Sequence, residues 1–127
     1  MDKLLNLELC AKYPKIFINK EGTPATTWNF ECKDGWFELI DQLCESIQNY
    51  INDNPNHKIQ QVRAEQIKEK YGSLRFYYSG GDELIEGMVW LAGSMSLHIC
   101  EQCGAKGELR ETKLGYYYTT CKLHVEQ

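Results

Sequence analysis

Apolar residues return every three or four positions in three parts of the chain, which is the spacing of one face of an α-helix. In the first part these residues are Leu4, Leu5, Leu9 and Tyr13. In the second part they are Trp36, Ile40, Leu43, Cys44, Ile47 and Ile51. In the third part they are Ile85, Met88, Val89, Ala92, Met95 and Ile99. The pattern therefore predicts three helices, each of which buries one face.

Residues that start and stop helices set the expected ends of these segments. Pro14 cannot continue a helix, so it should stop the first one. Asp34 and Asp82 have the type of side chain that caps a helix N-terminus, and we expect them at the start of the second and third helices. The run Asn-Asp-Asn-Pro-Asn at 52–56 should end the second helix. The third helix is expected to run to Cys100.

Two other segments show the signals of β-hairpins. Residues 74–78 are rich in aromatic side chains, which predicts a strand. Residues 71–73 form the expected turn before this strand, and residues 59–70 form the other arm. A smaller hairpin is expected near the C-terminus, with arms at 107–110 and 116–120.

These elements together predict an α+β fold of three helices and a β-hairpin, with a C-terminal structural zinc module. A chain of 127 residues, 43% of them hydrophobic, has the size and composition of one globular domain. We expect residues 1–99 to form the α+β core and residues 100–127 to form the zinc module. The module should pack on the core, so that the two make one compact unit.

The zinc module is predicted from two pairs of ligands. Cys100 and Cys103 are separated by two residues, and so are Cys121 and His124. Two such pairs of sulfur or imidazole ligands, joined by a short spacer, are typical of a structural zinc site of the zinc-ribbon or treble-clef kind. Four protein ligands fill the tetrahedron around Zn²⁺. Two alternatives stay open, which are a disulfide in an oxidising compartment and His98 in place of one ligand.

Charge and hydropathy limit the classes of partner. The net charge is −4, and an acidic protein is repelled by nucleic acid. Residues 58–79 are the exception, because they carry five basic and two acidic side chains. No apolar run approaches the roughly 20 residues that a membrane span needs, and the N-terminus lacks the pattern of a signal peptide. We therefore expect a cytoplasmic protein that has no membrane partner.

The basic hairpin at 58–79 is the second candidate site. Its candidate contact residues are Lys68, Lys70, Tyr71, Arg75 and Tyr77. Basic side chains among exposed aromatic rings can hold phosphates and stack on bases. Strand alternation offers a simpler interpretation, in which Leu74, Phe76 and Tyr78 face the core while the residues between them face solvent.

Several of these segments also carry a resemblance. They are the Asp-Gly-Trp-Phe run at 34–37, residues 68–78, the Gly-Gly-Asp run at 80–82 and the two ligand motifs. Together they resemble a family of small, uncharacterised phage and prophage proteins that have a C-terminal zinc module, and the likeness covers about residues 30–124. The resemblance implies a phage or prophage origin, and hence a bacterial cytoplasm. It brings no activity with it.

We expect a protein that acts by binding and has no enzymatic activity. The chain lacks the Pro-Cys-x-x-Cys motif of zinc deaminases and the His-Glu-x-x-His motif of metalloproteases. The predicted function is that of a phage accessory factor that binds a host or phage protein as a regulator or inhibitor, for example of host defence. The alternative is a nucleic-acid or nucleotide binder that uses the hairpin at 58–79.

Overall fold

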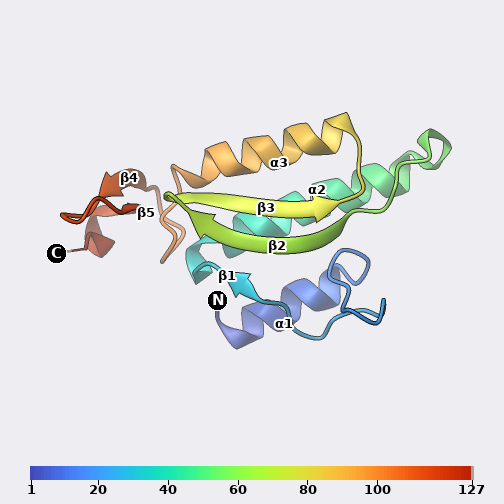
Figure 1. The fold of residues 1–127 in the computed structure, drawn as a ribbon, viewed down its shortest axis with the longest axis horizontal. Helices are drawn as coiled ribbons and strands as arrows, with labels where there is room; N and C mark the ends of the chain where they lie inside the picture. Colours follow the sequence, from blue (N-terminus) through green and yellow to red (C-terminus); the bar gives the residue numbers. More distant parts are fainter. Residues whose placement is uncertain (127) are drawn as a thin grey trace.

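The computed structural model describes residues 1–126 and shows an α+β fold with three helices among them (Figure 1). The helices are α1 (Lys3–Lys12), α2 (Phe37–Asp53) and α3 (Glu83–Ser96). The strands are β1 (Phe30–Glu31), β2 (Arg63–Lys70), β3 (Ser73–Ser79), β4 (Glu108–Glu111) and β5 (Tyr117–Thr120). Single turns of 3-10 helix lie at Asp34–Trp36, Pro55–His57 and Lys122–His124. The predicted fold class is confirmed, including the cluster of cysteine and histidine near the C-terminus.

Helix α3 begins as the sequence predicts but ends earlier. The Asp82 carboxylate accepts two backbone N–H groups of the first turn, at 3.1 and 3.2 Å, and so satisfies donors that have no partner within the helix. The helix was expected to run to Cys100, but it ends at Ser96. The chain turns back there, and Ile99 forms an isolated β-bridge with Lys106.

Helix α2 begins later than expected. The prediction that Asp34 caps this helix is wrong, because Asp34 lies inside a 3-10 turn and α2 starts at Phe37. The Asp34 carboxylate instead accepts the backbone N–H of Asp2 at 2.6 Å. The cause is tertiary: the N–H of Gly35 donates to the carbonyl of Glu101 at 2.7 Å, and this contact fixes the turn before the helix.

Strands β1, β2 and β3 form one sheet in that order, with β2 in the middle. The hairpin of β2 and β3 is confirmed, although its first arm starts at Arg63 instead of residue 59. Tyr71 and Gly72 form its turn, and their φ angles of +54° and +83° are those that a two-residue hairpin turn needs. Strand β1 pairs with β2 in parallel and was not expected, since two residues are too short to show alternation.

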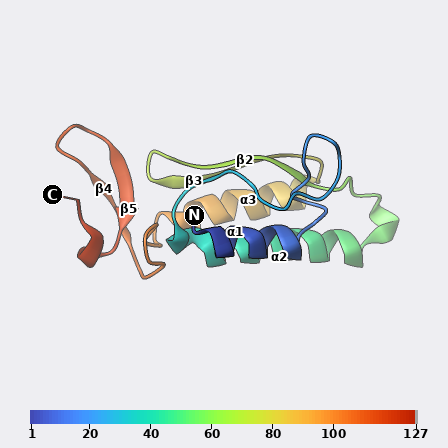
Figure 2. The ribbon, with the colours of Figure 1, turned by 90° about the horizontal axis from the view of Figure 1, so that it is seen from below.

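All three helices lie on one face of this sheet (Figure 2). The core between the two layers contains, among others, Trp36, Ile40, Ile47, Ile67, Phe76 and Ile85. Strand alternation holds in β3, because Leu74 and Phe76 are buried while Tyr77 is 42% exposed. The face of the hairpin that carries Tyr77 is therefore directed away from the helices.

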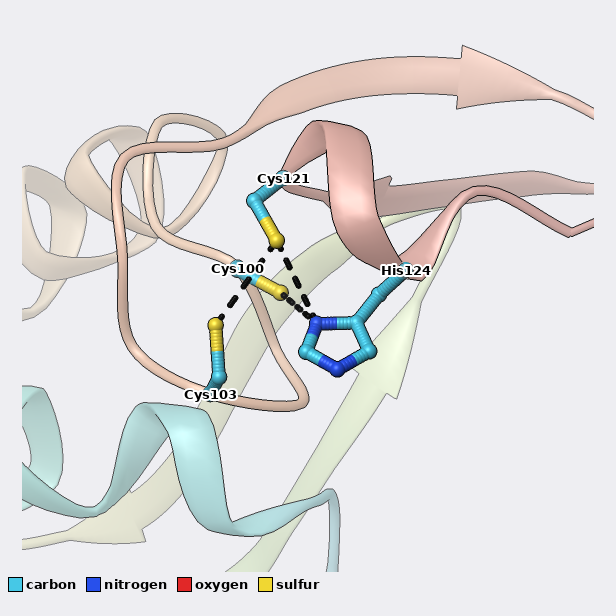
Figure 3. Close-up of side chains that lie close together, drawn as sticks. All are labelled: Cys100, Cys103, Cys121 and His124. Carbon is cyan, nitrogen blue, oxygen red and sulfur yellow. Dashed lines mark hydrogen bonds between the residues drawn. The ribbon is translucent and has the colours of Figure 1, made fainter.

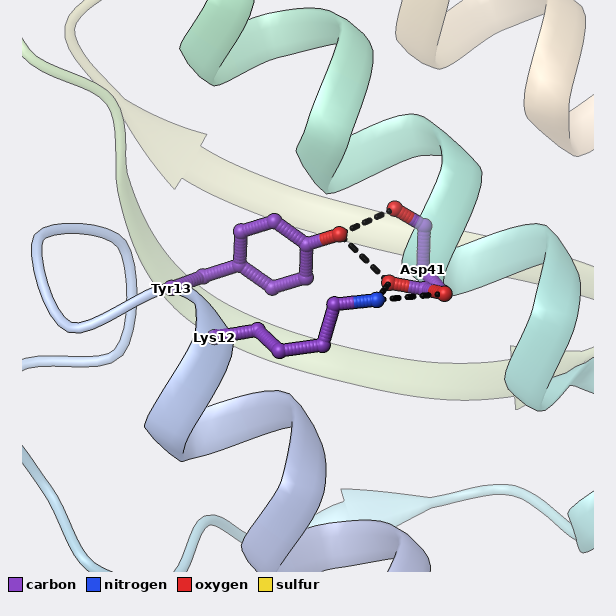
Figure 4. Close-up of polar contacts among 3 residues, drawn as sticks. All are labelled: Lys12, Tyr13 and Asp41. Carbon is purple, nitrogen blue, oxygen red and sulfur yellow. Dashed lines mark hydrogen bonds and ion pairs between the residues drawn. The ribbon is translucent and has the colours of Figure 1, made fainter.

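Three residues tie the end of α1 to the first half of α2 (Figure 4). The Tyr13 hydroxyl donates to the Asp41 carboxylate and lies 2.9 Å from the Asp41 backbone carbonyl. The Lys12 ammonium pairs with the same carboxylate at 2.8 Å. Burial of the Tyr13 ring, and then its bond to Asp41, raise the pKa of the phenol. An exposed ion pair adds little stability, so the buried tyrosine is the stronger link.

The C-terminal segment 100–126 packs against the end of the sheet that holds the hairpin turn (Figure 1). The indole N–H of the fully buried Trp36 donates to the carbonyl of Ile99, the residue directly before this segment, at 2.9 Å. The hydroxyl of Thr119, also fully buried, donates to the carbonyl of Gly72 at 2.6 Å. These bonds fix where the segment sits on the rest of the chain.

Candidate metal centre

The structure brings Cys100, Cys103, Cys121 and His124 to one point (Figure 3). Each residue offers one ligand atom, and these atoms all lie within 4.8 Å of one another. The first two cysteines lie in the loop after α3, Cys121 directly follows β5, and His124 ends the last 3-10 turn. The residues that the sequence predicts as ligands are therefore brought together by the fold.

The distances between these atoms fit a tetrahedral metal site. The Sγ atoms of Cys103 and Cys121 are 3.7 Å apart, and the Nδ1 atom of His124 lies 3.6 Å from Cys100 Sγ and 3.2 Å from Cys121 Sγ. Around zinc, neighbouring ligand atoms lie about 3.8 Å apart for two sulfurs and about 3.5 Å apart for sulfur and nitrogen. The cysteines are free, so the geometry fits one metal ion bound by three sulfurs and one nitrogen.

Two glycines shape the loop that carries the first two ligands. Gly104 has a φ of +81° and its N–H donates to the carbonyl of Cys100 at 2.8 Å. A Cβ at Gly107 would lie 2.8 Å from the backbone of Cys100, so a side chain has no room there. The N–H of Cys100 donates to the carbonyl of Ala105 at 2.7 Å. This tight turn lets the thiols of Cys100 and Cys103 lie on the same side of the loop.

The surroundings of the cluster favour a thiolate at Cys100. Burial of this thiol acts to raise its pKa, but neighbouring backbone N–H groups, among them those of Cys121 and Cys103, outweigh burial and lower the pKa to about 6. At Cys103 the N–H of Ala105 acts to lower the pKa, but desolvation and the nearby thiols outweigh it and the pKa is raised. Three thiols this close cannot all ionise cheaply without a cation between them.

The other three cysteines and the alternative ligand His98 lie outside the cluster. Cys10, Cys32 and Cys44 are buried in the core, where burial raises the pKa of Cys10 to about 11 and that of Cys32 to about 12. Protonated, buried thiols are poor ligands and poor nucleophiles. His98 is exposed, and the structure places His124 in the cluster, not His98.

A metal site with four protein ligands keeps no open position for a substrate, so this ligand set is of the kind found in structural sites. Segment 100–126 has few other means to hold its shape, because none of its large apolar side chains is buried. Its buried residues are Cys100, Glu101, Gly107, Thr119, Thr120 and Cys121. Small units without a hydrophobic core depend on disulfides or metals. The ligand cluster is the cross-link that this segment has available.

The candidate residues of the basic hairpin lie on the outer face of the sheet or in its turn: Lys68, Lys70, Tyr71, Arg75 and Tyr77. Lys68 lies directly opposite Arg75 in the register of the two strands. Glu31 of β1 lies beside Lys68 on the other side and offsets part of this charge. The alternation that places Leu74 and Phe76 in the core is confirmed, while binding by the outer face stays a prediction.

Helix α3 exposes four large apolar side chains, which the sequence analysis missed. They are Leu84 (54% exposed), Trp90 (76%), Leu91 (55%) and Met95 (45%). The assignment of Met95 to the buried face is wrong, because it lies with Leu91 in a groove of about 150 Å³ between α3 and α2. Trp90 lies on the other flank of α3, beside β3. The sequence shows only that α3 carries apolar residues on nearly every side, and not which of them stay exposed.

No protein-family model, curated protein or solved structure matches this chain. Among residues 1–126, no helix has both the length and the apolar character that crossing a membrane requires. Function therefore has to be inferred from the metal centre and the exposed surfaces.

Proposed function

We propose that this chain is a zinc-stabilised protein without enzymatic activity that acts by binding another protein. The observation that carries the proposal is the apolar flank of α3 next to α2, which we call the α2–α3 groove. It contains Leu39, Leu43, Met88, Leu91, Ala92 and Met95 among its lining residues. Contiguous exposed apolar side chains mark interaction sites on soluble proteins.

The spacing of the apolar residues along this flank of α3 fits such a role. Leu84, Met88, Leu91 and Met95 follow one another at intervals of four, three and four residues, and therefore form a stripe along one face of the helix. Such a stripe normally packs against another element. Methionine side chains adapt to differently shaped partners. The α2–α3 groove thus suits an apolar segment of a second protein.

The metal in this proposal is Zn²⁺. Three thiolates and one imidazole suit zinc, whereas magnesium and calcium prefer oxygen ligands. The ion holds the loop after α3 and the end of β5 together, in the manner of a zinc ribbon or a treble clef. It thereby keeps segment 100–126 folded against the core, and it takes no part in chemistry.

The resemblance to phage and prophage proteins supports a place of action in the bacterial cytoplasm. An accessory factor of this kind binds a host or phage protein and regulates or inhibits it by occupying its surface. Host defence proteins are one class of target that fits this origin.

Reconstitution with a purified partner tests the proposal. The tagged, zinc-containing chain is purified from a bacterial host, and the protein that stays with it is prepared separately and titrated by calorimetry. We expect a complex of fixed stoichiometry that Leu91→Asp weakens at least tenfold. Leu114→Asp is the matched control, because Leu114 is 85% exposed and lies far from the groove in the β4–β5 turn. The proposal fails if no protein stays bound or if both variants bind alike.

A nucleic-acid binder is the second candidate, and one observation favours it. Lys68 lies opposite Arg75, and Lys70 follows at the turn, so three cations lie close together on the hairpin. Binding of a single-stranded oligonucleotide should then weaken steeply with salt and be lost when Lys70 and Arg75 are both changed to Glu. This candidate function is excluded if the wild type does not bind the oligonucleotide, or if the double variant binds it as tightly as the wild type.

A further inference from the structure

Strand β3 is the open edge of the three-stranded sheet, on the flank of α3 that faces away from the α2–α3 groove. The opposite side of β2 is covered, because β1 pairs with it and the N–H of Ala64 donates to the carbonyl of Ile16 at 2.9 Å. Among residues 1–126, no strand pairs with the outer side of β3. An open edge offers unpaired N–H and C=O groups to any strand that can reach it.

The hydrogen bonds of Leu74 show which backbone groups face outward. Its N–H donates to the hydroxyl of Ser96 on α3 at 2.8 Å, and thus points away from β2. Backbone groups that face one side recur at every second residue of an antiparallel strand. The N–H and C=O groups of Phe76 and Tyr78 therefore face the same way. Within residues 1–126 these four groups have no hydrogen-bond partner on that side.

The edge is bordered by a groove and is not blocked. Helix α3 also lies close to β3 at Gly93, where an added Cβ would lie 3.3 Å from the carbonyl oxygen of Leu74. Beside this contact a groove of about 420 Å³ runs between β3 and α3, and Trp90 forms part of its wall. Strand β3 contains no proline, which is one of the devices that keep exposed edges from pairing.

The charges near the two ends of β3 complement those of β3 in a second copy that runs antiparallel. The start of β3 includes Arg75 and pairs with Lys70 at the end of β2, whereas the chain after β3 leads through Gly80 and Gly81 into Asp82 and Glu83 at the start of α3. A second copy that runs antiparallel brings its acidic end beside the basic start, and two-fold symmetry repeats this contact. A parallel copy would place like charges together. The edge is thus complementary to itself in one orientation.

We propose that two copies of this chain pair through β3 about a two-fold axis, which joins their three-stranded sheets into one. Phe76 of each copy lies opposite Tyr78 of the other, so that all four outward groups find partners. Tyr77 meets its counterpart across the axis on the outer face, where cross-strand aromatic pairs stabilise sheets. Trp90 borders the junction on the helix side. This contact leaves the α2–α3 groove free, and it goes beyond the proposed function.

Sedimentation velocity of the zinc-loaded full chain over a range of concentrations tests the pairing. We expect a species of twice the chain mass of 14.8 kDa. Tyr77→Lys sets two like charges opposite each other at the axis, and should raise the dimer dissociation constant at least tenfold. Gln66→Lys is the matched control, because Gln66 is exposed on the same face but lies one strand further from the axis, opposite Tyr77. It should leave the dimer intact.

Three results would overturn the proposal. They are a chain that stays monomeric at its highest soluble concentration, a dimer that Tyr77→Lys leaves intact, and a dimer that Leu91→Asp disrupts. Amide exchange gives a second readout, since the amides of Phe76 and Tyr78 should gain protection as the concentration rises. If these amides gain protection from exchange only when a different protein is added, the β3 edge binds that protein and not a second copy. Failure to find a protein partner for the α2–α3 groove leaves the dimer test unaffected, so the two proposals fail separately.

Discussion

His124 supplies the one nitrogen of the ligand cluster, with its Nδ1 atom 3.2 Å from the sulfur of Cys121. His124→Ala leaves three ligands, so we expect zinc affinity to fall by at least about tenfold. Competition with a chromophoric chelator measures this affinity. His98→Ala is the control, since His98 is exposed and lies outside the cluster. Equal losses in the two variants would contradict the assignment of the ligand.

Tyr13 is the residue that links α1 to α2 most firmly. Tyr13→Phe removes the hydroxyl that donates to Asp41, and should lower the free energy of unfolding by about 1 to 2 kcal/mol. Denaturant unfolding measures the difference. Tyr71→Phe makes the same chemical change at a side chain that is 67% exposed, and should alter stability by less than about 0.5 kcal/mol. A smaller effect at Tyr13 than at Tyr71 would show that the link is not a stabilising one.

The same tyrosine should make stability depend on pH in alkaline solution. Burial of Tyr13, and then its bond to Asp41, raise its pKa above the ordinary value of 10.0. The unfolded chain releases this proton near pH 10, whereas the folded chain keeps it. The contribution of Tyr13 is therefore fully present below about pH 10 and is lost as the pH rises towards the folded pKa. Above pH 10, the free energy of unfolding should therefore fall more steeply with pH for the wild type than for Tyr13→Phe. An equal pH dependence in the two proteins would contradict this.

At the scale of elements, Gly35 is the point where the turn before α2 meets the loop after α3. A Cβ there would lie 2.0 Å from the carbonyl oxygen of Cys100, so Gly35→Ala must push these two segments apart. We expect a loss of about 1 to 3 kcal/mol in the free energy of unfolding. Gly87→Ala is the control, because no atom lies within 4 Å of its added Cβ in the exposed part of α3. It should stabilise the chain by about 0.5 to 1 kcal/mol.

The elements that could be predicted are those with a signal in their own residues. Asp82 starts α3 because its carboxylate can reach the first-turn N–H groups without help from the rest of the chain. Asp34 has the same chemistry, yet it does not cap α2, since Gly35 is held by Glu101 from a distant part of the sequence. Strand β1 exists only through its pairing with β2. Long-range contacts of this kind produce no periodic pattern in the sequence, so they could not be predicted from it.

The metal ligands and the exposed surfaces also differ in how far the sequence alone predicts them. The ligands could be predicted because each pair is encoded by its spacing, and the fold needed only to bring Cys100 and Cys121 together. The exposed flank of α3 could not, because a helix that is apolar on most sides does not reveal which sides find a partner. Met95 and Leu91 remained exposed since α2 covers only part of that face.

At the scale of the whole molecule, the metal should decide whether segment 100–126 is folded. None of its large apolar side chains is buried, and metal binding supplies folding free energy in such modules. After a chelator is added, we expect the amides of β4 and β5 to exchange rapidly while those of β2 and β3 stay protected. Hydrogen exchange followed by mass spectrometry measures both sets in one sample. Protection of β4 and β5 that survives chelation would show that the module folds without metal.

The central proposal is that one zinc ion, held by Cys100, Cys103, Cys121 and His124, keeps the C-terminal segment ordered. Native mass spectrometry of the full chain, purified from its host without added metal, measures this most directly. We expect one Zn²⁺ per chain in the wild type and in Cys10→Ser, and none in Cys121→Ser. A folded wild-type chain without metal, or a Cys121→Ser chain that keeps its full zinc content, would contradict the structural zinc site.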